Sequence, residues 1–130
     1  MKHTTYRVQT PASTNPGNQL AAKFGNYVRT ERGPVTVLVM ESTNGRAEGT
    51  MVNTLLITPF DAETFTVDVF VGGGRQGLLL LGGKGEVLEQ EKILKQLQQL
   101  GAEHDWRILA QESRGHKRGS FYTNYSNTAN

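Results

Sequence analysis

The sequence predicts an α+β domain in which two helices cover one face of an antiparallel meander sheet of four to six strands, in the order β-α-β-β-β-β-α-β. Three observations lead to this prediction. Strand-forming runs follow one another across short turns in the middle of the chain. Two other segments carry apolar residues at helical spacing. The chain of 130 residues is 36% hydrophobic and has no cysteine, which fits a single domain with one core and excludes a disulfide scaffold.

The N-terminal segment predicts one strand and one helix. Residues 4–9 are rich in strand formers and are followed by Pro11. Asn15-Pro16 is a typical helix start, and Gly33-Pro34 is a typical helix end. We therefore expect one helix between these two signals, with a basic outer side. Its apolar stripe consists of Leu20, Phe24, Tyr27 and Val28.

The middle of the chain predicts the meander. Residues 35–40 and 50–58 favour strands, and Asn44-Gly45 between them is a hairpin signal. Residues 64–71 alternate, which directs Phe65, Val67, Val69 and Val71 to one face and Thr66, Asp68 and Phe70 to the other. Residues 77–81 are expected to form the fourth strand of the meander.

The C-terminal third predicts a helix, a strand and an arm. Residues 86–100 carry a buried stripe of Ile93, Leu94, Leu97 and Leu100, and Gly101 is the expected cap. Residues 106–111 favour a last strand. The predicted organisation is therefore a domain over residues 1–112 and a basic, aromatic arm over residues 113–130.

The charges are segregated along the chain. Residues 1–32 hold five basic residues and one acidic residue, and residues 113–130 hold three basic residues and no acidic one. Residues 33–112 hold six basic and eleven acidic residues, so the net charge of +2 hides an acidic middle between two basic ends. Such asymmetry is typical of a polyanion-binding surface or a basic tail.

The first functional hypothesis is a non-enzymatic protein that binds nucleic acid, preferably single-stranded. Cations neutralise phosphates, and aromatic rings stack on unpaired bases. Phe70 is a further aromatic, on the polar side of its strand. We expect it either to stack on bases, to pack under a helix or to lie in a subunit contact. The expected phosphate contacts are Arg114, Lys117 and Arg118, extended by Arg29 and Arg32 if the first helix lies beside the arm, and the arm's aromatics are Phe121, Tyr122 and Tyr125.

The second hypothesis is a protein that binds or sequesters a small phosphorylated ligand of nucleotide type. The segment from Gly72 to Gly77 fits G-x-G-x-x-G, but no helix is expected to open there, so a dinucleotide-binding fold is not indicated. The segment from Gly82 to Gly85 lacks the remainder of a phosphate-loop pattern. Free backbone N–H groups beside a cation still suit an anion. The residues concerned are Gly73, Gly74, Arg75, Gly83 and Lys84.

A third hypothesis is a structural protein whose arm reaches a neighbouring subunit. A homo-oligomer is expected in any case, because a meander has two free edges. No catalytic signature, metal-ligand spacing or cofactor motif is present in the sequence, so neither catalysis nor a cofactor is expected. The N-terminus lacks a signal peptide and no apolar run spans a bilayer, which predicts a cytoplasmic protein, prokaryotic or viral, without a membrane partner.

Overall fold

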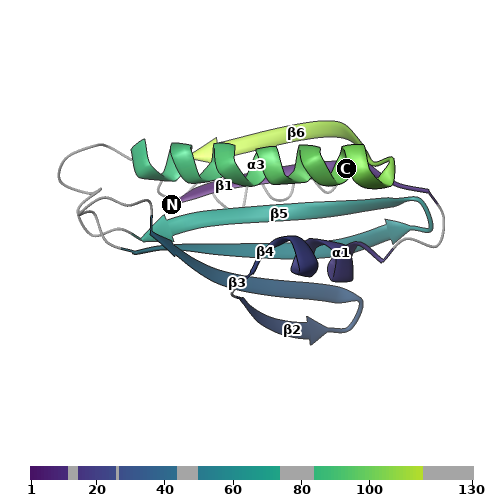
Figure 1. Ribbon diagram of the computed structural model, residues 1–130, viewed down its shortest axis with the longest axis horizontal. Helices are drawn as coiled ribbons and strands as arrows, with labels where there is room; N and C mark the ends of the chain where they lie inside the picture. The colour runs from purple at the N-terminus through teal and green to yellow at the C-terminus, as the bar shows by residue number, and fades with distance from the viewer. Residues whose placement is uncertain (12–14, 26, 44–49, 74–83, 116–130) are drawn as a thin grey trace.

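The structure, a computed structural model, describes residues 1–11, 15–25, 27–43, 50–73 and 84–115, which form six strands and two helices. Their bounds are β1 Lys2–Gln9, α1 Pro16–Lys23, β2 Val28–Arg32, β3 Val35–Thr43, β4 Thr50–Asp61, β5 Thr64–Gly73, α3 Lys84–His104 and β6 Arg107–Gly115. The strands form one sheet in the order β2-β3-β4-β5-β1-β6. Both helices lie in front of this sheet in Figure 1. The predicted fold class and element order are confirmed.

One side of the sheet is completed by pairing between the two ends of the chain. Strands β2 to β5 follow one another as antiparallel hairpins, and β1 then lies between β5 and β6. Lys2 is opposite Val71 on one side and opposite Gly115 on the other. The first strand of the chain therefore holds the last strand in the sheet.

The core lies between the sheet and α3. Leu38, Leu55, Val67 and Val69 point to the helix side and are fully buried. The alternation predicted for residues 64–71 is confirmed, as is the apolar stripe of the second helix, in which Ile93, Leu97 and Leu100 are buried and Leu94 packs against them. Burial of such side chains stabilises the fold by about 1.5–3 kcal/mol each, so this layer supplies most of the stability.

The first helix is shorter than the sequence indicated. Asn15 is its N-cap as predicted, because its side chain accepts a hydrogen bond of 3.0 Å from the Asn18 N–H. The helix ends at Lys23, and Phe24 is already extended at φ −95° and ψ 129°. The next residues form β2 instead, so Tyr27 and Val28 do not continue the apolar stripe of a helix, and that prediction is wrong.

The reason lies in two short turns. Gly25 and Asn26 are turn formers placed directly after the helix, and β-branched residues such as Val28 then favour a strand. Gly33 has a φ of +58° and, with Pro34, makes the tight turn between β2 and β3. A glycine with positive φ at the first central position is what a two-residue hairpin requires. Gly33-Pro34 therefore closes a hairpin rather than ending a helix.

The second helix and the last strand run further than predicted. Gly101 lies inside α3, which continues to His104. Asp105 then adopts a φ of 61°, and the Trp106 N–H donates to the Gly101 carbonyl at 3.0 Å, which is the Schellman arrangement at a helix end. The strand β6 reaches Gly115, three residues beyond the predicted end of the domain at residue 112.

Two further predictions concern a fourth meander strand and the absence of a membrane-spanning segment. The strand expected at residues 77–81 lies outside the described residues. In the part of the chain that is described, neither helix has the length and apolar character that a membrane crossing needs.

Gly17 provides a test of how α1 packs on β3. It is buried, and a Cβ at this position would lie 2.7 Å from Oγ1 of Thr36, which is held by a hydrogen bond of 2.9 Å to Glu31. Gly17→Ala is therefore expected to destabilise the protein by about 1–3 kcal/mol, measured by urea unfolding. Gly25→Ala is the control, because a Cβ there meets nothing within 4 Å, and it should change the stability by less than about 0.5 kcal/mol. Equal effects of the two substitutions would contradict this packing.

Candidate nucleic-acid interface

The face of the sheet opposite the two helices, here called the open face, is uncovered by any described element. Strand alternation and register decide which residues lie on it. It divides into two halves. The half on β2, β3 and β4 is mainly apolar, and its apolar side chains are Val28, Val35, Val37, Val39, Val52 and Leu56. The half on β5, β1 and β6 carries aromatic and polar residues.

A stacked pair of rings stands on the second half. His3 of β1 and Phe70 of β5 are direct cross-strand neighbours, and their ring centroids lie 4.2 Å apart at an interplanar angle of 8°. On its other side Phe70 is next to the short Thr54 of β4. Phe70 is thus on the polar side of its strand, as predicted, and it is half-buried on the face away from the two described helices, so neither of them packs over it.

The His3 ring is held by two neighbours on the same face. The Thr5 hydroxyl donates to Oδ1 of Asp68 at 2.6 Å. His3 Nε2 lies 3.0 Å from the same carboxylate oxygen and 3.2 Å from the Thr5 oxygen. Because the Thr5 proton is directed to Asp68, both oxygens act as acceptors, and Nε2 must carry the hydrogen that they share.

This cluster is not a catalytic triad. In a triad the hydroxyl donates to one imidazole nitrogen and the carboxylate accepts from the other. Here the hydroxyl donates to the carboxylate, and one imidazole nitrogen meets both groups. The geometry orients the His3 ring against Phe70 and does not activate Thr5 as a nucleophile.

A second contact that involves an aromatic ring of the open face lies further along β1. The Arg7 guanidinium carbon is 5.7 Å from the centroid of the exposed Phe60 ring, a cation–π distance. Arg7 is exposed and forms no ion pair with a carboxylate of the described residues. His3 and Arg7 are four residues apart on one strand face, a separation of about 13 Å.

The predicted basic residues Arg29 and Arg32 are not on the half of the open face that carries His3 and Phe70. Arg29 and Arg32 lie on β2, at the edge of the sheet opposite β6. Five strand spacings separate the two edges, about 24 Å. Arg29 instead donates to Glu31 at 2.7 Å. This hydrogen bond, followed by one from Thr36, holds the pKa of Glu31 below its usual range. Arg29 and Arg32 are thus on a strand and not on the expected helix, and the extension of a basic track by these two residues stays a prediction.

The structure places only part of the predicted arm and loops. Arg114 is on β6 directly opposite His3, at the edge of the open face. Gly73 ends β5, and Lys84 begins α3. The remaining predicted residues lie outside the described part of the chain: Gly74, Arg75, Gly83, Lys117, Arg118, Phe121, Tyr122 and Tyr125.

Sequence analysis did not single out His3, Thr5, Arg7 or Phe60 as site residues. The signal available was the alternation of β1, which puts its odd-numbered residues on one face. Which strand lies beside β1 is set by long-range pairing, and no local pattern reveals it. Comparison with known proteins adds no functional information, because the chain matches no protein-family model and no curated protein is recognisably similar to it.

The hydrogen bond between Thr5 and Asp68 is tested by a double-mutant cycle. Thr5→Val and Asp68→Ala, alone and combined, should show a coupling energy of about 1–2 kcal/mol in urea unfolding, because the carboxylate is charged and partly buried. Thr58→Val, on β4 of the same face, is the control and should couple to Asp68→Ala by less than about 0.5 kcal/mol. Additive effects of Thr5 and Asp68 would show that this bond does not orient the cluster.

Proposed function

We propose that the protein binds single-stranded nucleic acid along β1 on the open face, and that residues 116–125 continue the binding surface. The observation that carries the proposal is the His3–Phe70 stack on a sheet face that no described element covers. One face of the Phe70 ring is against His3, and the other is on the side of the short Thr54. A base can stack on that second ring face, and every base has a π face, so this contact is tolerant of sequence.

The charges on this half of the open face indicate where phosphates and where bases would bind. Asp68 lies directly opposite Thr5, and its carboxylate makes this row unfavourable for phosphate. Arg7 lies beyond that row at one end, and Arg114 lies at the other end, opposite His3. Phosphates are therefore expected at these two ends, and a base is expected on the Phe70 ring, which shares the register row of His3 and Arg114.

The basic segment follows directly on this surface. Gly115 pairs with Lys2, and Lys117 and Arg118 are two and three residues further along the chain. Three residues span at most about 10 Å, so the chain length allows both cations to approach the stacked rings in this proposal. Phe121, Tyr122 and Tyr125 then supply further rings for stacking. Arg114, Lys117 and Arg118 would bind phosphate in this proposal.

The proposal predicts salt-sensitive binding that depends on Phe70. A labelled single-stranded DNA or RNA 20-mer is titrated in fluorescence anisotropy at several salt concentrations. The logarithm of the affinity should fall with the logarithm of salt by about 0.7 per phosphate contact. Phe70→Ala should weaken binding by about 5- to 150-fold, the value of one base–aromatic stack.

Two variants complete the test. Tyr27→Ala removes a partly exposed aromatic beside β2, at the far edge of the sheet, and should bind like the wild type. Removal of residues 116–130 should reduce the salt dependence. Binding that is unchanged in Phe70→Ala, or stronger to duplex than to single strands, would contradict the proposed interface.

The apolar half of the open face favours a second function, assembly with another copy. Val28 is 67% exposed, and Val37 and Val39 continue the apolar surface on β3. Sheets that present such faces pack about 10 Å apart with aligned strands. This contact would leave the half on β5, β1 and β6 accessible at the side of the dimer.

The assembly function predicts that a charged residue introduced on β3 dissociates the oligomer. Wild-type protein should elute as a dimer or larger in size-exclusion chromatography with light scattering, and Val37→Lys should be monomeric, because a buried unpaired ammonium opposes face-to-face packing. Val87→Lys changes an equally apolar, 42% exposed residue on the helix side and should leave the oligomer intact. A monomeric wild type would rule this assembly out.

A further inference from the structure

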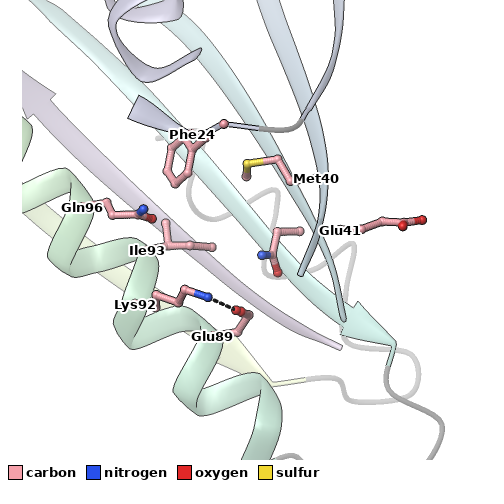
Figure 2. Close-up of a pocket in the computed structure, with 9 residues that line it drawn as sticks. Phe24, Met40, Glu41, Glu89, Lys92, Ile93 and Gln96 are labelled. Atoms are coloured by element: carbon pink, nitrogen blue, oxygen red, sulfur yellow. Dashed lines mark hydrogen bonds and ion pairs between the residues drawn. The ribbon is translucent and has the colours of Figure 1, made fainter. Parts of the chain in front are cut away.

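A pocket of about 190 Å³ lies on the helix-covered face of the sheet, beyond the end of α1 (Figure 2). The two helices meet near the C-terminal end of α3, where Lys23 and Glu103 form an ion pair of 3.7 Å. Helix α1 has eight residues and α3 has 21, so the N-terminal half of α3 extends past α1. The pocket is lined by Phe24, Gly25, Met40, Glu41, Asn53, Glu89, Lys92, Ile93 and Gln96.

The side chain of Asn53 indicates that this pocket receives a ligand. Asn53 is 4% exposed, and its Oδ1 accepts no hydrogen bond from the described residues. A buried amide without its partner destabilises a fold, and an apolar residue of similar size would pack there without that cost. The carboxamide presents a donor and an acceptor side by side, so it suits a ligand edge that carries both.

A second buried polar group lies across the pocket. Glu89 is 3% exposed, and its Oε1 is 3.4 Å from Nζ of Lys92, whose side chain is 57% exposed and extends toward solvent. Figure 2 shows this pair on α3, with Glu41 directed away from it. The ammonium already offsets the Glu89 charge, which disfavours a second cation beside it. A neutral ligand with N–H donors is favoured instead.

The walls and the size narrow the ligand further. Phe24, Met40 and Ile93 are buried and provide apolar surface. The pocket volume of 190 Å³ is below the roughly 300–1,000 Å³ typical of sites for drug-sized ligands. One planar ring system therefore fits inside, and a charged substituent would remain at the rim beside Lys92.

We propose that this pocket binds the amino-substituted base of a mononucleotide. The exocyclic amine of adenine, cytosine or guanine has two hydrogens, and in this proposal it donates them to Oδ1 of Asn53 and to the Glu89 carboxylate. Lys92 would then lie near the phosphate. The site is on the opposite face of the sheet from His3 and Phe70, so it goes beyond the proposed binding of single strands.

Calorimetric titration of the full-length protein with AMP, CMP and UMP tests the base. AMP or CMP should bind, and UMP should bind at least about tenfold more weakly, because uracil has no exocyclic amine. Asn53→Leu should lower the affinity for AMP or CMP at least about tenfold and raise the melting temperature by several degrees, since it removes a buried amide that lacks a partner.

Gln90→Leu is the matched control for Asn53→Leu. Gln90 is another buried amide with an unpartnered Oε1, but it donates to Thr4 and does not line the pocket. It should therefore keep the wild-type affinity. Equal losses in both variants, no binding of any nucleotide at millimolar concentration, or binding of arginine in place of nucleotides would overturn the proposal.

The phosphate contact is tested separately. Lys92→Ala should weaken AMP but not adenosine, and Lys95→Ala, an exposed lysine on the same helix outside the pocket, should change neither. Asn53→Leu should still bind the single-stranded 20-mer like the wild type. A parallel loss of 20-mer and mononucleotide binding in Asn53→Leu would show that no separate site exists.

Discussion

The alternation of side chains on β3, β4 and β5 is the constraint on which the rest of the architecture depends. Leu38, Leu55 and Val67 are fully buried on one face because Ile93 and Leu97 of α3 pack over that layer. A period of two then fixes every intervening residue on the other face. Among the described residues, two helices of eight and 21 residues cover one face only, so the open face follows from the same pattern that builds the core.

The position of β1 decides what that uncovered face can do. Its even-numbered residues Tyr6 and Val8 enter the core, and its odd-numbered residues His3 and Arg7 therefore lie on the open face. Thr4 fastens the strand in place, since its hydroxyl accepts from Gln90 of α3 at 2.6 Å and lies 3.1 Å from the Ser113 hydroxyl of β6. The candidate interface is thus assembled from both ends of the chain, and it forms only when the whole domain folds.

The sequence predicts local features well and long-range pairing poorly. The period of two in residues 64–71 and the apolar stripe from Ile93 to Leu100 are both found as predicted, because burial on one side imposes them. The neighbours of β1 depend on contacts between residues 2 and 115, which leave no local signature. The sequence therefore did not reveal that Arg29 and Arg32 lie on an edge strand far from β6, or that His3 lies beside Phe70.

The wrong length of the first helix has a physical explanation and a consequence. Leu20, Phe24 and Val28 keep helical spacing, yet two turn residues after Phe24 allow the chain to leave the helix and form β2. Phe24 and Gly25, which directly follow α1, line the pocket. A helix that continued through residue 32 would extend beyond them. The early end of α1 therefore leaves Asn53 and Glu89 facing a pocket instead of a second helix. A buried amide without a partner is tolerable in such a place if a ligand supplies the missing donor. The unexpectedly short first helix is thus connected with the proposed ligand pocket.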